Sequence, residues 1–436
     1  MNNTEINLFW FRRDLRLDDN AGLFHVLSSG LPVLPIFIFD DDILLKLDNK
    51  EDARVTFIYD EVLRIKQEIE SRGGSLLIKR GRPAGIFREL TGRFRISKVF
   101  ANHDYEPYAR NRDDRVGKLL SEQGIRFITF KDQVIFEKDE ILKDDGKSYT
   151  VFPPYSRRWK SALSGSSFTK HNSAGLTGNF LKMMPMDVPA LSSLGFNRSR
   201  LTFPPREPDA GILQHYHRDR DFPALQGTSR MGPHLRFGTV SIRKLAEMAH
   251  KTNEVFLNEL IWREFYMMIL WHFPHAAERA FKPQYDRIAW RNDEQQFRAW
   301  CEGRTGYPIV DAGMRELNAT GYMHNRVRMI TASFLARHLL IDWRWGDAWF
   351  ASKLLDFELS SNNGGWQWAA GTGCDAAPYF RVFNPVLQAE KFDPEKNYIR
   401  QWVPEYGTGS YPPPIVEHSR ARLLAIETYQ KALKPD

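Results

Sequence analysis

The sequence has very little of what defines several common protein classes. Only two cysteines, Cys301 and Cys374, occur among 436 residues, which excludes a disulfide framework and indicates a reducing, cytoplasmic setting. No stretch is apolar for long enough to span a bilayer, and the N-terminal residues lack the layout of a signal peptide. The histidines do not fall at zinc spacings with cysteine partners, and no G-x-S-x-G elbow is present. Secreted, membrane-spanning, zinc-dependent and elbow-type hydrolase classes are therefore not expected.

What the sequence does contain is an excess of aromatic side chains and a moderately basic balance of charge. Phe, Trp and Tyr make up 13% of the chain, and 61 Lys and Arg against 54 Asp and Glu give a net charge of +7. Aromatic faces stack on flat ligands, and positive charge suits a polyanionic partner such as nucleic acid. Packed helices and many soluble proteins share both features, so composition alone decides little. We expect a monomeric protein.

The hydrophobic pattern predicts differently built parts. Residues 1–130 alternate short apolar runs, such as 8–11 and 33–39, with helical segments, which predicts an open parallel α/β sheet. No G-x-G-x-x-G follows a strand there, so a dinucleotide site in that part is unsupported. Residues 131–205, rich in charge, Pro, Ser and Gly, predict an interdomain connector on the surface. Residues 206–436 predict an aromatic-rich helical domain, so the fold class is α/β plus all-α.

The stretch at residues 356–370, DFELSSNNGGWQWAA, concentrates unusual chemistry. Asn362 and its neighbour offer amide donors and acceptors, and two glycines allow close approach of the backbone to a bulky ligand. Trp366 and Trp368 present large, oxidisable faces. A tight turn before a buried aromatic helix is the plain structural interpretation. A binding site for a flat ligand is the functional one, and two amides beside two indoles favour it.

Three further motifs each allow a structural and a functional interpretation. GTSRMG at residues 227–232 precedes a helix, and it is either an ordinary cap or a cradle for a phosphate. Glu259 shares one face of a predicted helix at residues 256–273 with Trp262 and Arg263, so it either pairs with an arginine or bonds the polar edge of a base. YMHNRVRM at residues 322–329 is either a basic face with core methionines or a polar, soft floor for a flat ligand.

Two other patterns are interpreted more simply. Trp290, Trp343 and Trp366 each fit a core position, and if they line up in space they form an electron-hopping chain. HYHRDRD at residues 215–221 fits a polar helix start better than a metal cluster, because arginines are mixed with the ligand types.

Several long motifs together resemble one known family, the photolyase/cryptochrome superfamily, and most closely the class I cyclobutane pyrimidine dimer photolyases. The resemblance covers nearly the whole chain. It is carried by WFRRDLRLDDN at 10–20, YTVFPPYSRRW at 149–159, NELIWREFY at 258–266, TGYMHNRVRMITASFL at 320–335 and NNGGWQWAAGTGCDAAPYFRVFNP at 362–385. Such long motifs are highly specific, and chance agreement at three of them is negligible.

The resemblance implies an α/β antenna domain followed by a helical domain that binds FAD. The residues that match the cofactor positions of the family are Tyr216, Thr228, Ser229, Arg230, Met231, Gly232, Phe256, Arg263, Arg328, Asp356, Glu358 and Asn362. Asp356 is expected to pair with Arg328, and Asn362 is expected against flavin N5. Phe256 and Glu358 stand where close relatives carry Trp and Asp.

The implied substrate is a covalently linked pyrimidine pair in DNA, which must leave the base stack to reach a buried flavin. Glu259 would hydrogen-bond the dimer and stabilise its radical anion, with Asn325 and Met329 as opposing walls and Trp262 and Trp368 packed against the flipped bases. Matching DNA-contact positions are Arg220, Arg326 and Gln388, beside Glu259, Trp262, Arg263 and Asn325.

The implied chemistry is light-driven. Excited, fully reduced FAD donates one electron to the dimer, the ring splits and the electron returns. Trp366, then Trp343, then Trp290 would relay electrons inward to reduce oxidised flavin.

The main alternative is a blue-light receptor cryptochrome without repair activity, but plant-type receptors carry Asp where this chain has Asn362. A second antenna chromophore is also implied. The Asn-Glu pair of folate-binding relatives is absent after Tyr105-Glu106, so a deazaflavin, a flavin, a folate or an empty site stays open.

Overall fold

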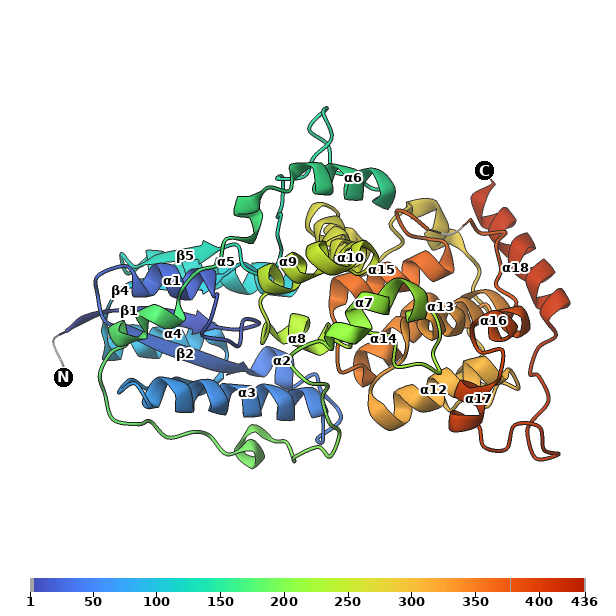
Figure 1. Cartoon of the computed structure of the whole chain (residues 1–436), viewed down its shortest axis with the longest axis horizontal. Coiled ribbons are helices and arrows are strands. Elements are labelled where there is room, and N and C mark those ends of the chain that lie inside the picture. The colour runs from blue at the N-terminus through green and yellow to red at the C-terminus, as the bar shows by residue number, and fades with distance from the viewer. Residues whose placement is uncertain (1–3, 377, 435–436) are drawn as a thin grey trace. The chain divides into compact units, whose positions relative to one another are not determined.

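The computed structural model describes residues 4–376 and 378–434 (Figure 1). The chain divides into two compact units. Unit 1 comprises Met1–Glu137, Ala162–Glu207 and Met231–Lys251, and unit 2 comprises Lys138–Ser161, Pro208–Arg230 and Thr252–Asp436. The stretch at 131–205, which the sequence suggests as a connector, therefore contributes to both units.

Unit 1 is built on a five-stranded parallel sheet, as the apolar runs predict. The strand order is β3-β2-β1-β4-β5. The strands are β1 (Glu5–Phe11), β2 (Val33–Asp40), β3 (Leu77–Gly81), β4 (Arg95–Asn102) and β5 (Arg126–Phe130). In β1, Phe9 lies opposite Pro35 of β2 and Phe100 of β4. Side chains alternate between the faces of a strand, so β1 and β2, which are mostly apolar and almost entirely buried, require cover on both faces.

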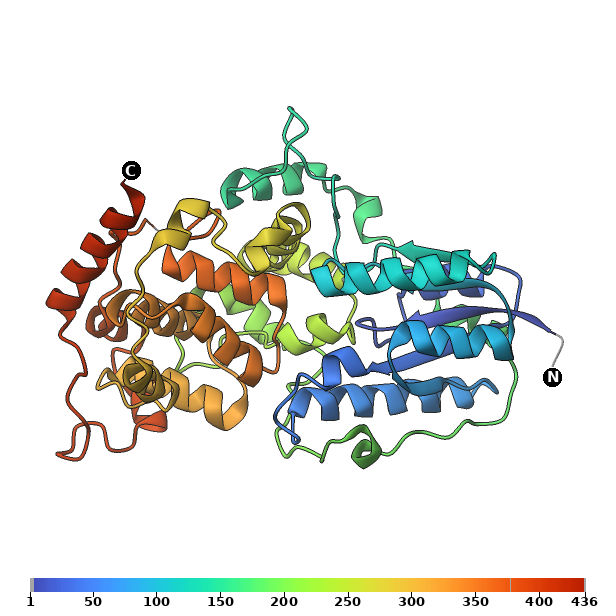
Figure 2. The same ribbon diagram turned by 180° about the vertical axis from the view of Figure 1, so that it is seen from behind.

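Helices supply that cover on both faces of the sheet (Figure 2). Side chains of α1 (Ala21–Leu27) and α3 (Ala53–Glu70) pack with Phe9 and Phe37 on one face. Those of α4 (Pro83–Arg93) and α5 (Pro107–Ser121) pack with Leu8 and Ile36 on the other. The remaining helices of unit 1 are α2 (Asp41–Leu44), η1 (Gly165–Phe168), η2 (Ala174–Asn179), η3 (Leu191–Leu194), α8 (Gly232–Phe237) and α9 (Ile242–Thr252).

Unit 2 is helical, and its core gathers aromatic and aliphatic side chains around Trp300, Trp343 and Trp366. Its first helices are α6 (Phe152–Ala162), α7 (Ala210–Asp219), α10 (Glu254–His272), η4 (Pro274–Ala277), η5 (Pro283–Arg287), α11 (Glu294–Cys301) and α12 (Pro308–Thr320). The others are α13 (Asn325–Ser333), the π-helical turn η6 (Phe334–His338), α14 (Trp343–Lys353), α15 (Leu359–Ala370), α16 (Pro385–Phe392), α17 (Asn397–Trp402) and α18 (His418–Leu433). The helices predicted around residues 256–273 and 325–340 are confirmed, the second with a π-helical end.

Helix α15 corrects the expectation of a tight turn at residues 356–370. The helix begins at Leu359, so both asparagines, both glycines and both tryptophans lie inside it. Gly371, in the left-handed conformation, ends it. A Cβ atom added at Gly364 would lie 2.2 Å from the Tyr266 ring of α10, and one added at Gly346 of α14 would lie 2.1 Å from Trp366. Glycines therefore bring α15 into closer contact with two neighbouring helices than any other residue would allow.

Among the described residues, no helix combines the length and apolarity that crossing a membrane requires.

The two glycines of α15 predict opposite effects of the same substitution. Gly364→Ala places a methyl group on the Tyr266 ring, and overpacking of this kind should destabilise unit 2 by about 1 to 3 kcal/mol. Gly365→Ala meets no atom within 4 Å and should instead stabilise the helix by about 0.5 to 1 kcal/mol. Urea unfolding followed by tryptophan fluorescence reports on unit 2, because every tryptophan but Trp10 belongs to it. Equal midpoints for the two variants would contradict this account of α15.

Candidate active site

One cluster of charged side chains surrounds Glu259 on α10. Asn253 caps the start of this helix by accepting hydrogen bonds from two backbone N–H groups, which fixes where the helix begins. The Glu259 side chain, 30% exposed, forms an ion pair with Arg220 at the end of α7. Burial raises the pKa of Glu259, although Arg220 opposes the shift. The simpler alternative from the sequence, a carboxylate paired with an arginine, is thus what the ligand-free protein shows.

Helix α13 brings a second pair to the same region. Arg326 donates to Asp221 at 2.8 Å, one residue beyond the partner of Glu259, and its guanidinium lies 4.3 Å from the centre of the Phe392 ring. Its Nη1 is 3.8 Å from the Met329 sulfur. Asn325, the first residue of α13, is exposed. Gln388 lies one turn before Phe392 on α16, so Arg326 contacts Asp221, Met329 and the helix that carries Gln388.

Two further arginine–carboxylate pairs lie where the sequence predicts cofactor binding. Arg328 of α13 donates to both oxygens of Asp356, at 3.1 and 2.9 Å, so the predicted pair is observed. Burial lowers the pKa of Arg328, but the carboxylate of Asp356 outweighs it, and the pKa is raised. Arg263 of α10 donates to Glu358 at 3.2 Å, next to the start of α15.

Asn362 on α15 has a defined amide orientation. Its Nδ2 donates to the Asp347 carboxylate at 2.7 Å and to the Asp347 backbone carbonyl at 3.1 Å. The backbone carbonyl can only accept, so the nitrogen must face α14, and Oδ1 points the other way as an acceptor. Among the described residues no donor reaches that Oδ1. Asn363 has a structural role instead, because it accepts from Gln367 and donates to the Ala277 carbonyl.

The remaining predicted cofactor residues lie on α7, near the start of α10 and at residues 228–232. The rings of Tyr216 and Phe256 meet at 5.1 Å and 63°. The Thr228 hydroxyl lies 3.1 Å from the Tyr322 hydroxyl, and the Arg230 guanidinium lies 4.5 Å from the centre of the Tyr322 ring. Ser229 follows Thr228 in the same segment. Met231 and Gly232, at the start of α8, belong to unit 1.

The tryptophans proposed as a relay all belong to or contact one core. Trp343 and Trp366 are buried in it, and Trp290 packs against it. Trp366 meets Phe350 at 5.0 Å and Trp300 at 6.0 Å between ring centres. No pattern in the sequence singles out Trp300, because only the packing of distant helices places its indole beside Trp366. The ring of Trp290 meets Tyr429 edge-on.

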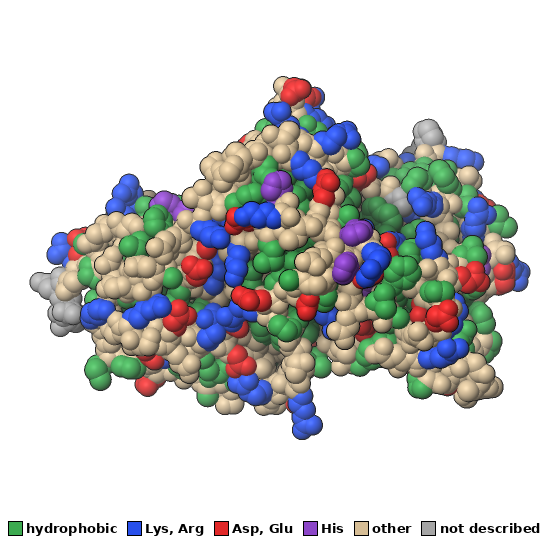
Figure 3. Space-filling view, in the orientation of Figure 1, with side chains coloured by type: hydrophobic (Ala, Val, Ile, Leu, Met, Phe, Trp, Pro, Cys, Tyr) green, Lys and Arg blue, Asp and Glu red, His purple; other side chains and the backbone are tan. Residues whose placement is uncertain are grey.

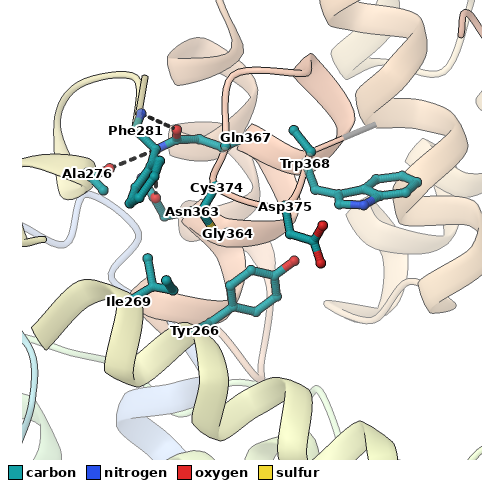
Figure 4. Close-up of a pocket in the computed structure, with 12 residues that line it drawn as sticks. Tyr266, Ile269, Ala276, Phe281, Asn363, Gly364, Gln367, Trp368, Cys374 and Asp375 are labelled. Atoms are coloured by element: carbon teal, nitrogen blue, oxygen red, sulfur yellow. Dashed lines mark hydrogen bonds between the residues drawn. The ribbon is translucent and has the colours of Figure 1, made fainter. Parts of the chain in front are cut away.

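Two tryptophans expected to contact the lesion lie on facing helices. Trp262 of α10 is half-buried and stacks on Phe152, while Trp368 of α15 lies 6.2 Å from Phe383. Trp368 also lines a pocket together with Tyr266 and Asp375. In Figure 4 the Tyr266 hydroxyl points toward the Asp375 carboxylate across this pocket.

Neither the surface charge on the face shown nor the described metal-ligand residues mark a further site. On the face shown in Figure 3, basic and acidic side chains are interspersed, so the net charge does not form one patch there. The described part of the chain contains no group of three or more His, Cys, Asp or Glu that could hold a metal ion. The HYHRDRD segment, expected as a helix start, in fact includes the end of α7.

Comparison with known proteins agrees with this geometry. Residues 256–409 match the family described as the FAD binding domain of DNA photolyase, and residues 7–173 match the family described as DNA photolyase. A deoxyribodipyrimidine photo-lyase of Escherichia coli is 36% identical over 98% of this chain and 99% of its own length, and one of Halobacterium salinarum is 35% identical over 98% and 99%. The chain belongs to the DNA photolyase family, and it carries that family's FAD-binding domain.

Solved structures give the same result for the fold. A bacterial class III photolyase from Agrobacterium tumefaciens has a TM-score of 0.87 and 32% identity, covering 99% of this chain and 98% of its own. An archaeal photolyase from Sulfolobus tokodaii, described with two FAD molecules, has a TM-score of 0.81 and 33% identity, covering 98% and 100%. A cryptochrome from Synechocystis, at 23% identity and a TM-score of 0.82, shares the fold.

The carboxyl group beside Asn362 predicts an unusual dependence of stability on pH. Burial raises the pKa of Asp347 to about 7, against the hydrogen bond from Asn362, which lowers it. Because the folded pKa lies above the unfolded one, this group lowers the free energy of unfolding as the pH rises from about 4 to about 7. Asp347→Asn removes that cost, so its stability relative to the wild type should be greater at pH 8 than at pH 5 by roughly 2 to 3 kcal/mol.

Urea unfolding of both proteins at the two pH values, followed by tryptophan fluorescence, measures this difference. Asp342→Asn, at the cap of the same helix, is a matched control and should show no comparable trend. A constant difference between Asp347→Asn and the wild type would show that Asp347 titrates normally.

Proposed function

We propose that this chain is a light-dependent DNA repair enzyme, a deoxyribodipyrimidine photo-lyase that splits cyclobutane pyrimidine dimers. The observation that carries the proposal is that α10, α13 and α15 each contain residues assigned to the cofactor and residues assigned to the lesion or the DNA. Helix α10 has Glu259 on the lesion side and Arg263, paired with Glu358, one turn later. Helix α13 likewise has Arg326 and Met329 beside Arg328. Cofactor and lesion would therefore be held next to each other by rigid elements.

The residues present fit FAD. The unpartnered Oδ1 of Asn362 is an acceptor, which suits the N5–H of a reduced flavin, and Gly365 leaves open space on the same helix. Residues 228–232 with Tyr216 would hold the phosphate and ribose side, and Phe256, Arg263, Arg328, Asp356 and Glu358 would line the cofactor. When bound, photoexcited reduced FAD supplies the electron that splits the dimer and takes it back after the ring has opened.

The chain's own side chains would bind and orient the lesion. Glu259 would exchange Arg220 for a polar edge of the flipped-out dimer, and its raised pKa lets it act as a hydrogen-bond donor at a higher pH than an ordinary carboxyl group. Asn325 and Met329 would form the opposing walls, with Trp262 and Trp368 against the bases. Arg220, Arg326 and Gln388 would contact the DNA strand around the lesion.

Trp366, Trp343 and Trp290 would relay electrons toward an oxidised flavin, a preparatory step separate from repair. Their placement in or against one core supports this role. Asn362 does not support the alternative of a blue-light receptor without repair activity, because plant-type receptors carry Asp at this position.

We also propose a second, antenna chromophore in residues 1–130, which precede a connector over 131–205 and the catalytic part over 206–436. In a parallel sheet of order β3-β2-β1-β4-β5, ligands bind beyond the carboxyl ends of β1 and β4, where the strand order reverses. Arg12 and Asn102 mark those ends. We place the enzyme in the cytoplasm as a monomer.

An absorption spectrum of the purified protein tests the antenna proposal. FAD alone gives one flavin spectrum, while a deazaflavin or a folate adds a separate band and a second flavin raises the ratio of flavin to protein to two. A spectrum with one FAD per chain, unchanged after incubation with these chromophores, would contradict it.

A repair assay tests the proposed function. When the reduced protein is mixed with DNA that carries a thymine dimer, the amount of dimer should fall under blue light and stay constant in the dark. Glu259→Leu should lower repair by at least about tenfold, because a hydrogen bond to a charged group is worth about 1.5 to 3 kcal/mol. Glu259→Gln, which keeps one acceptor and gains a donor, should fall between the two. If the wild type causes no light-dependent loss of dimers, the proposed repair activity is wrong and a receptor function is favoured.

A further inference from the structure

Helix α6 belongs to the stretch that the sequence suggests as a connector. The side chains on one face of α6 contact α10 along the length of the helix. Its residues at positions 152, 155, 156, 159 and 160 share a side, as the helical repeat requires. The Ser156 hydroxyl donates to Asn258 at 3.3 Å, and Lys160 pairs with Glu254 at 2.6 Å. Every turn of α6 therefore contacts α10, whereas a surface linker makes few contacts with the helices beside it.

A buried carboxylate fixes the middle of this contact. Glu264 of α10 accepts from the Trp159 indole N–H at 2.5 Å and from the Tyr155 hydroxyl at 3.4 Å. All three side chains are buried. Hydrogen bonds to a charged acceptor in a dry setting are strong and directional, so α6 cannot slide along α10 without losing them.

At its first residue, α6 meets Trp262. The rings of Phe152 and Trp262 are 3.6 Å apart between centres and only 7° from parallel, so Phe152 covers one face of the indole. Phe265 meets the same indole edge-on at 5.6 Å, and Tyr266 lies 5.4 Å away at 34°. Phe152 itself is buried, whereas Trp262 is only half-buried. Phe152 therefore fixes the plane of the Trp262 indole from one face, and the exposed part of the indole lies outside this stacked face.

The position of Phe152 is fixed in turn by the segment that follows α15. Asp375 accepts the backbone N–H of Phe152 at 2.8 Å, which satisfies one of the open donors at the start of α6. Asp375 lines the pocket beside Trp368 (Figure 4). The same carboxylate therefore connects the surroundings of the two tryptophans assigned to the lesion.

We propose that Phe152 is a positioning residue for the repair reaction, one that holds the Trp262 indole in the orientation in which it receives a flipped-out base. The inference rests on the proposed function, which places Trp262 against the lesion. A free tryptophan side chain would have to be ordered when the base arrives, at a cost in affinity. The stack on Phe152 orders it beforehand, so Phe152 selects for lesion-containing DNA without touching it.

Three variants test this role. Phe152→Leu keeps an apolar side chain but removes the flat ring, Phe152→Tyr keeps the ring, and Lys160→Ala breaks the ion pair at the far end of the same helix. Fluorescence anisotropy gives the Kd of each for dimer-containing and undamaged duplexes, and repair is measured at saturating DNA. Phe152→Leu should weaken binding of dimer DNA by about three- to tenfold. Its binding of undamaged DNA and its repair at saturation should be unchanged, and the other two variants should match the wild type.

A measurement without DNA separates this inference from the proposed function. Near-ultraviolet circular dichroism reports the fixed stack of two aromatic rings, and the contribution of Trp262 is identified by its loss in Trp262→Phe. Phe152→Leu should lose that contribution, while Phe152→Tyr and Lys160→Ala should keep it. This outcome can hold even if the wild type repairs nothing.

Two results would overturn the proposal. One is an unchanged Kd of Phe152→Leu for dimer DNA. The other is equal weakening for damaged and undamaged DNA, which would show a general structural role. If Phe152→Leu melts well below the wild type, Phe152→Met provides a second flexible side chain of similar volume for the same comparison.

Discussion

The close approach of α15 to α10 and α14 is the constraint on which the candidate site depends. Gly364 brings α15 against Tyr266, and Gly346 brings α14 against Trp366, at distances that leave no room for a Cβ atom. This packing places the amide of Asn362 within reach of Asp347 and places Glu358 within reach of Arg263. The hydrogen bonds that orient the site are therefore consequences of helix packing, and they share its rigidity.

Much of the fold follows from periodicity in the sequence. The apolar runs at 8–11 and 33–39 become β1 and β2 of the five-stranded parallel sheet, because strands covered on both faces need apolar side chains along most of their length, and that pattern is visible locally. Residues 356–370 show the limit of local reasoning. Two asparagines and two glycines favour a turn, yet the segment is helical. At Gly364 the Tyr266 ring leaves no room for the Cβ atom of a better helix former, a constraint that only the packed structure reveals.

The sequence motifs indicate candidate residues for the site, but they do not indicate most of the partners of those residues. The motifs at 258–266 and 320–335 indicate Glu259 and Arg328, and the pair of Arg328 with Asp356 is as expected. Asp347 and Trp300 carry no signal in the sequence, and Phe152 lies in the motif at 149–159 without any role assigned to it there. Their importance comes from contact with residues far along the chain, and only the packing of α6, α11 and α14 against other helices creates that contact.

Four arginines at the site, all of those described there except Arg230, already have a carboxylate partner. Arg220 is paired with Glu259, Arg326 with Asp221, Arg263 with Glu358 and Arg328 with Asp356. A phosphate that takes over Arg220 or Arg326 leaves behind an acidic group, which must then recruit a cation from solution. That uptake cancels part of the ion release that normally drives proteins onto DNA. Affinity for the double helix should therefore vary less steeply with ionic strength than the number of arginines at the site suggests.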